Sequence, residues 1–208
     1  ECKVGLVPDV GGSLLLARAP GRLGEYLGIT STRMKPGDAL HAGFADYYIP
    51  RAAWGALIET LCETGDWEAV DRAAEPAPAS DLAEARPEID ALFAGETLRD
   101  VVNLLESTEG DLAEKTLAAL NQNSPISMAC TLELIHRVRS TDTIETALEM
   151  EYRFTSRSME KADFLEGIRA VIIDKDNAPN WRHDGPRSVP PGEVSALLRP
   201  LGADALNI

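Results

Sequence analysis

The sequence has few cysteines and histidines, and their placement argues against two common kinds of site. It contains three cysteines, an odd number, spread widely along 208 residues: Cys2, Cys62 and Cys130. A disulfide framework or a zinc site is not expected, because either would need these residues in closely spaced groups. The three histidines are scattered as well, and we expect none of them to be catalytic. The sequence therefore favours a reducing compartment and predicts no metal site.

Long apolar runs and positive charge are also scarce. No stretch approaches the ~20 apolar residues that a membrane span needs, and no signal peptide opens the chain. Lys and Arg number 20 against 34 Asp and Glu, for a net charge of −14. An acidic surface disfavours binding to nucleic acid or to anionic membranes. An anionic ligand would therefore need a local basic patch.

The composition is that of a globular protein. Hydrophobic residues make up 44% and charged residues 26%, which is ordinary for a chain with a packed core. The first residue is Glu1, and the apolar and turn residues directly after it are typical of the middle of a domain. We therefore expect a fragment, a processed chain or one part of a longer polypeptide.

Short apolar segments and turns dominate the first 50 residues. Residues 2–7, with two valines, predict a short strand or an extended edge segment. The Pro, Asp and two glycines of residues 8–12 predict a turn that leads into a helix. Residues 45–49 predict a second short strand. Beyond about residue 51 the pattern is almost entirely helical, interrupted by a loop at the Pro/Ala-rich residues 74–80.

Capping residues locate the longer helices. Ser124-Pro125 predicts an N-cap followed by proline at the first helical position. Thr141 or Asp142 is expected to cap a further helix that runs to Met159. Residues 164–173 predict the last strongly apolar helix, and a Pro- and Gly-rich tail follows it.

Two carboxylates, Glu1 and Asp9, flank the first apolar segment. Carboxylates in different environments can divide the roles of base or nucleophile and of acid or orienting group. Spacing alone leaves another interpretation open, in which Glu1 lies in solvent and Asp9 caps the helix after the turn.

A resemblance to a known family favours the catalytic interpretation. The segment ECKVGLVPDVGGSLLLARAPGRLGEYLGIT resembles the 3-hydroxyisobutyryl-CoA hydrolases, a branch of the crotonase (enoyl-CoA hydratase/isomerase) superfamily. Three later blocks match the family in order: TRMKPGDALHAGFADYYIP, SPISMACTLELI and MEYRFTSRSMEKADFLEGIRAVIIDKDNAPNW. Residues 66–100 match least. The resemblance implies that the chain is the C-terminal portion of such an enzyme.

The resemblance also implies roles for individual residues. The catalytic carboxylates of the family fall on Glu1, as nucleophile or general base, and on Asp9, which would orient or protonate. Gly11 and Gly12 would let the backbone turn into a helix N-terminus near the substrate, and the helix dipole there would help to keep Asp9 ionised. For these glycines plain turn geometry is the alternative.

Two cationic residues are candidates for binding the CoA phosphates. Arg169 and Lys175 lie near the end of the last long helix, and solvated charges at a helix end are the alternative. No metal or redox cofactor is implied, and coenzyme A enters only as part of the substrate.

Related enzymes differ at a few positions. Enoyl-CoA hydratases typically carry Gly or Ala where Asp9 stands, and an Ala-Phe pair where this chain has Ala170-Val171. The superfamily's dehalogenases also use an Asp near this turn, but the EGIRAVIIDKD block favours the hydrolase. A hydratase or isomerase, and a non-catalytic helical fragment that binds a partner chain, remain the alternatives.

The implied fold is the crotonase-like α/β fold with its β-spiral core, here mainly the α-helical C-terminal part. Residues 1–50 would end the core and residues 51–208 would form the helical region. The oxyanion-hole donors would come from segments upstream of Glu1, so the N-terminal part of the same enzyme is an expected partner, beside the acyl-CoA substrate. A homo-oligomer is a further expectation. The compartment would be the cytoplasm of a bacterium or the mitochondrial matrix of a eukaryote.

Overall fold

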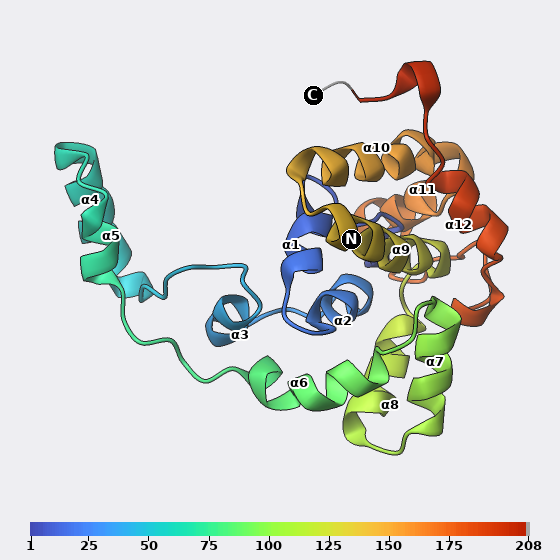
Figure 1. The fold of residues 1–208 in the computed structure, drawn as a ribbon, viewed down its shortest axis with the longest axis horizontal. Helices are drawn as coiled ribbons and strands as arrows, with labels where there is room; N and C mark the ends of the chain where they lie inside the picture. Colours follow the sequence, from blue (N-terminus) through green and yellow to red (C-terminus); the bar gives the residue numbers. More distant parts are fainter. Residues whose placement is uncertain (207–208) are drawn as a thin grey trace. The chain divides into compact units, whose positions relative to one another are not determined.

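The chain is mostly helical in its computed structural model, which describes residues 1–206. Within that range it has no strand, and its only β contact is an isolated bridge between Tyr48 and Glu75. None of the described helices is long and apolar enough to cross a membrane. The α-helices (Figure 1) are α1 Gly12–Arg18, α2 Leu23–Thr30, α3 Pro36–His41, α4 Trp54–Thr64, α5 Glu68–Ala73, α6 Asp81–Leu92, α7 Leu98–Ser107, α8 Asp111–Leu120, α9 Pro125–Thr141, α10 Ile144–Lys161, α11 Phe164–Ile168 and α12 Pro191–Leu197.

The chain divides into two compact units. The first consists of Glu1–Thr32 and Pro87–Ile208, and the second of Arg33–Arg86. All the predicted site residues belong to the first unit. The predicted boundary at residue 50 refers to the fold of the intact protein and stays a prediction.

Helix α9 forms the centre of the first unit (Figure 1), where α1, α2, α10 and α12 all pack against it. Its apolar side chains are fully buried, as expected for a helix surrounded by others. They include Ile126, Met128, Leu134, Ile135 and Val138. The predicted start of this helix is confirmed: the Ser124 hydroxyl accepts a hydrogen bond from the Ser127 N–H at 3.2 Å, and Pro125 is the first helical residue.

The helix after α9 starts later than predicted. Thr143 is the N-cap of α10, and its hydroxyl accepts a hydrogen bond from the Thr146 N–H at 3.3 Å. Asp142 has a left-handed backbone with φ of 52° and ends α9. The predicted caps, Thr141 or Asp142, were therefore wrong by one or two residues, because Asp142 serves the helix before it.

The predicted strand at residues 2–7 is wrong. Residues Cys2–Val4 form a 3₁₀ helix, which ends at Gly5 with φ of 74°. A side chain at Gly5 would lie 2.5 Å from the Asp163 backbone, so only glycine allows this approach. The Cys2 carbonyl accepts a hydrogen bond from the Ser124 N–H at 3.0 Å. The apolar residues thus dock onto helices, and this segment gives no reason to expect a partner strand.

The second unit contains α3, α4, α5 and the beginning of α6. The strand predicted at residues 45–49 is wrong, because only Tyr48 makes a bridge, to Glu75. Residues 74–80 form the predicted loop. The C-terminal end of this loop is held by buried Asp38, which accepts hydrogen bonds from the Ser80 hydroxyl at 2.8 Å and the Leu82 N–H at 3.0 Å.

Candidate active site

Glu1 and Asp9 lie at the two ends of the segment that precedes α1. Glu1 is exposed, and its carbonyl accepts hydrogen bonds from the Val4 and Leu6 N–H groups at 2.9 and 3.2 Å. Asp9 is half-buried, and its carbonyl accepts one from the Gly12 N–H at 2.8 Å. Within residues 1–206 neither side-chain carboxylate forms a hydrogen bond or an ion pair with the protein. Both carboxylates therefore have no bonding partner among the described residues.

The turn that carries Asp9 has an unusual backbone. Val10 has φ of 56° and Gly11 has φ of 84°, both in the left-handed region. Glycine adopts this conformation readily, but a β-branched residue does so at a cost of about 1–3 kcal/mol, which surrounding contacts must offset. Val10 is 87% exposed, so its own side chain does not supply those contacts.

Those contacts come from Glu151, on α10. One of its carboxylate oxygens accepts a hydrogen bond from the Gly11 N–H at 2.9 Å, and the other accepts from the Ser13 N–H at 3.0 Å. The Ser13 hydroxyl also donates to the second oxygen. Glu151 therefore caps the N-terminus of α1, the role that the alternative interpretation assigned to Asp9.

Glu151 is only 2% exposed, which makes its carboxylate an expensive group to bury. Burial raises its pKa, and the hydrogen bonds from Ser13 and Gly11 oppose that rise. The negative charge of Asp9 also acts to raise the pKa of Glu151, because like charges close together repel. Sequence reasoning did not identify Glu151. Its only signal was membership of the MEYR block, because no spacing rule links positions 138–140 residues apart.

Gly11 and Gly12 lie where the sequence placed them, in the turn and at the start of α1. Their N–H groups are already used within the chain, by the Glu151 carboxylate and by the Asp9 carbonyl. Plain turn geometry thus accounts for both glycines, and a direct contact with substrate stays a prediction.

The two predicted phosphate ligands, Arg169 and Lys175, differ in whether their charges are already paired with carboxylates. Arg169 starts a π-helix, Arg169–Ile173, and forms ion pairs with three carboxylates, those of Glu166, Asp174 and Asp176, at 2.7–2.8 Å. These pairs raise the pKa of the guanidinium above its usual range, with Glu166 the largest cause. Lys175 is exposed and, within residues 1–206, has no ion pair. Of the two predicted phosphate ligands, Lys175 is the one with its charge available.

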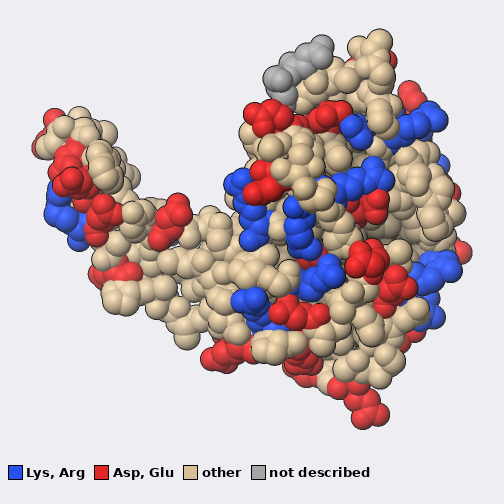
Figure 2. Space-filling view, in the orientation of Figure 1, with Lys and Arg blue, Asp and Glu red and all other residues tan. Residues whose placement is uncertain are grey.

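Basic side chains gather over the middle of the first unit, interleaved with acidic ones, on the face that Figure 2 shows. Several arginines of the first unit already form ion pairs with carboxylates. Arg18 pairs with Asp142 at 2.6 Å, and Arg139 pairs with Glu25 at 2.7 Å. Among the described residues there is also no group of three or more His, Cys, Asp or Glu that could hold a metal ion.

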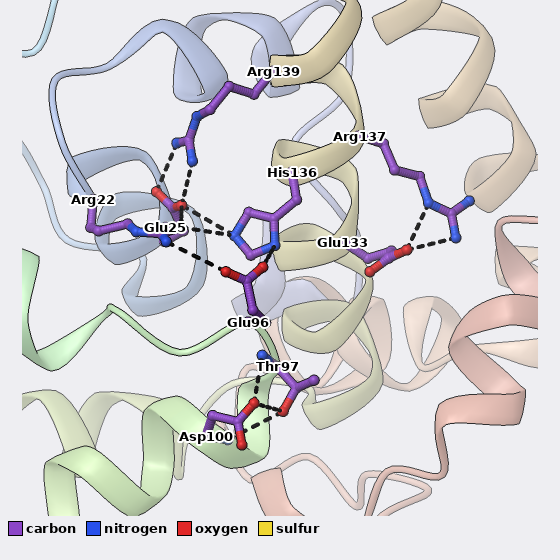
Figure 3. Close-up of polar contacts among 9 residues, drawn as sticks. All are labelled: Arg22, Glu25, Glu96, Thr97, Asp100, Glu133, His136, Arg137 and Arg139. Atoms are coloured by element: carbon purple, nitrogen blue, oxygen red, sulfur yellow. Dashed lines mark hydrogen bonds and ion pairs between the residues drawn. The ribbon is translucent and has the colours of Figure 1, made fainter.

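The largest ionic cluster of the first unit surrounds Glu25, on α2 (Figure 3). This fully buried carboxylate accepts hydrogen bonds from Arg139 at 2.7 and 3.0 Å, from Arg22 at 2.8 Å, and shares one with His136 at 3.2 Å. Burial acts to raise the pKa of Glu25, but the hydrogen bonds outweigh it and hold the pKa well below its usual range. The cluster ties α2 to α9, so its role here is structural.

Comparison with known proteins identifies the class. The sequence profile of the enoyl-CoA hydratase/isomerase family matches residues 1–198. The chain belongs to that family. A solved structure described as an enoyl-CoA hydratase from Rhodobacter sphaeroides 2.4.1 is 52% identical, with a TM-score of 0.92, over 100% of this chain and 60% of that one. One described as a carnitinyl-CoA dehydratase from Mycobacterium thermoresistibile is 34% identical, with a TM-score of 0.89, over 97% and 58%. The expected crotonase-like fold, present here mainly as its helical part, is confirmed.

Curated relatives support the branch that the motifs indicated. The mitochondrial 3-hydroxyisobutyryl-CoA hydrolase of Rattus norvegicus is 32% identical over 218 residues, covering 100% of this chain and 56% of the relative. The human protein of the same name is 30% identical over 218 residues with the same coverage. The expected resemblance to these hydrolases is confirmed. The chain spans just over half the length of these relatives.

Proposed function

We propose that the intact protein hydrolyses the thioester of 3-hydroxyisobutyryl-CoA to 3-hydroxyisobutyrate and CoA, a step of valine degradation. The observation that carries this proposal is Asp9, a carboxylate with no partner among residues 1–206, in the turn where hydratases typically have Gly or Ala. The curated relatives named as 3-hydroxyisobutyryl-CoA hydrolases support it.

In the proposed reaction, water replaces the CoA thiol at the acyl carbon. Glu1 acts either as the general base that takes a proton from the attacking water, or as the nucleophile, in which case water then hydrolyses the mixed anhydride between Glu1 and the acyl group. Asp9 orients the reacting group or delivers the proton. The C–S bond breaks, and the departing thiolate takes up a proton. Oxidation states do not change, so the proposal needs no redox cofactor, and the two carboxylates need no metal.

The remaining parts of the site are proposed to come from the N-terminal part of the same enzyme. The reaction needs an oxyanion hole, and the loss of one backbone donor typically costs about 10²–10³ in rate. Exposed apolar side chains of the first unit, which include Val10, Leu15 and Ile173, would be covered by that part. In a eukaryote the enzyme would act in the mitochondrial matrix, which agrees with curated relatives whose names call them mitochondrial, and in a bacterium it would act in the cytoplasm.

A hydratase is the second candidate, because a structure 52% identical to this chain is described as an enoyl-CoA hydratase. The two functions are distinguished by measuring both activities on one preparation of the full-length protein. We expect release of free thiol from 3-hydroxyisobutyryl-CoA at a kcat/KM at least about tenfold above that for hydration of crotonyl-CoA, since a difference of ~1.4 kcal/mol in transition-state binding is enough. Dominant hydration with negligible thiol release would establish the second candidate instead.

A further inference from the structure

Glu151 is a buried carboxylate that the proposed reaction does not use directly. It lies on α10, 142 positions beyond Asp9 in the chain, yet its two oxygens bind the N–H groups of Gly11 and Ser13. These two groups lie one and three residues after the left-handed Val10 that sets the direction of the turn. No other acidic side chain among residues 1–206 hydrogen bonds to these N–H groups.

We propose that Glu151 is a positioning residue for Asp9: by holding the Gly11 and Ser13 N–H groups, it fixes the turn that aims the Asp9 carboxylate at the substrate. This inference rests on the function proposed above, in which Asp9 acts at the reacting thioester. It adds a residue that approaches the site through α10 and touches neither substrate nor reacting atoms.

The contacts explain why the residue is a glutamate. Two N–H donors two residues apart match the two oxygens of a carboxylate, and the Ser13 hydroxyl adds a third donor. A glutamine offers one acceptor oxygen and an NH₂ group, so one N–H would face another donor. An aspartate is one methylene shorter and would draw the turn toward α10 or lose the contact.

Charge adds a second reason for the coupling. Burial is the largest cause of the raised pKa of Glu151, and the charge of the nearby Asp9 carboxylate acts in the same direction, against the hydrogen bonds. Helix α1 offsets part of this repulsion, because the partial positive charge at its N-terminus faces the Glu151 carboxylate. Glu151 is thus held at the turn by its three hydrogen bonds although the Asp9 carboxylate acts against its charge.

The test is a double-mutant cycle in the full-length enzyme, with steady-state thioester hydrolysis of 3-hydroxyisobutyryl-CoA as the assay. The variants are Glu151→Gln, Asp9→Asn and the two combined. We expect Glu151→Gln to lower kcat by roughly 10- to 100-fold while KM changes less than about threefold, since a misplacement of about 1 Å can cost that much. In the Asp9→Asn background the same change should cost less than about threefold, because residues that act as a unit are not additive.

The matched control is Glu160→Gln, which removes the same charge from an exposed position on the same helix. It should leave kcat, KM and the melting temperature unchanged. If Glu151→Gln does not fold, Ser13→Ala replaces it in the cycle, since it removes only the hydroxyl that donates to Glu151. A smaller loss of kcat, again absent in the Asp9→Asn background, is expected for it.

Two outcomes distinguish failure of the Glu151 positioning role from failure of the proposed hydrolase mechanism. An equal loss of kcat from Glu151→Gln with and without Asp9, or no loss at all, would overturn the positioning role and leave the proposed hydrolase intact. Wild-type turnover in Asp9→Asn would overturn the proposed mechanism itself, whatever Glu151→Gln does.

Discussion

Replacing Asp9 by Asn or Glu1 by Gln in the full-length enzyme should lower kcat for thioester hydrolysis by about 10²–10⁴-fold, the usual contribution of a positioned acid or base. Each change keeps the size of the side chain and removes its charge and its capacity to exchange a proton. Neither carboxylate is held by the protein within residues 1–206, so neither substitution breaks a structural contact there. Steady-state kinetics with 3-hydroxyisobutyryl-CoA measure the effect.

The effects of each substitution on kcat and on KM show whether the residue acts in the reaction or in binding. A group that acts only in the transition state lowers kcat and kcat/KM together and leaves binding nearly unchanged. Glu109→Gln, at an exposed turn of the first unit, is the control and should behave as wild type. Turnover near the wild-type value in both Asp9→Asn and Glu1→Gln would remove the catalytic assignment.

Replacing Glu25 by Ala is expected to destabilise the first unit by about 2–3 kcal/mol, because it removes the charge-assisted hydrogen bonds of a fully buried carboxylate and leaves its half-buried cationic partners without it. Arg139 loses both of its hydrogen bonds to Glu25, and Arg22 loses its closest acidic partner. Chemical denaturation, followed by circular dichroism, measures the change. A loss below about 1 kcal/mol would show that the cluster behaves as an exposed ion pair does.

The control for this prediction is Glu133→Ala. Glu133 also pairs with an arginine, Arg137, at 2.7 Å (Figure 3), but both side chains are more than a third exposed. Exposed pairs contribute about 0–1 kcal/mol, so Glu133→Ala should cost far less than Glu25→Ala.

The low pKa of Glu25 adds a dependence on pH. The carboxylate holds its proton less tightly in the folded state than in the unfolded state, where its pKa is 4.5. Its contribution to stability is therefore complete above about pH 4.5 and is lost as pH falls below that value toward the folded pKa. Between pH 7 and pH 3 the wild type should lose stability that Glu25→Ala does not lose. Parallel losses in both would contradict the assignment.

Features set by local sequence could be predicted. Ser124 and Pro125 start α9 as expected, because a cap and the proline after it act within one helical turn. The Pro/Ala-rich residues 74–80 form a loop for a similarly local reason. The resemblance to a known family predicted the fold from ordered sequence blocks, without any account of packing.

Features set by distant contacts could not be predicted. Residues 2–7 have the composition of a strand, but Gly5 lies against the Asp163 backbone and the segment packs on helices instead. Glu25 and Glu151 look like ordinary helix-surface charges in the sequence. Apart from Arg22, which lies three positions before Glu25, the partners of both residues lie more than 100 positions away, so only the folded chain shows that both are buried and hydrogen bonded.

The measurement that tests the two-carboxylate mechanism most directly is a crystal structure of the full-length enzyme with a non-hydrolysable thioether analogue of 3-hydroxyisobutyryl-CoA. We expect carboxylate oxygens of Glu1 and Asp9 both to lie about 2.6–3.2 Å from the acyl group or from a water molecule bound at it, the distance that proton transfer requires. Side chains of Glu1 and Asp9 that point to opposite sides of their segment, with only one of them near the acyl group, would contradict the mechanism.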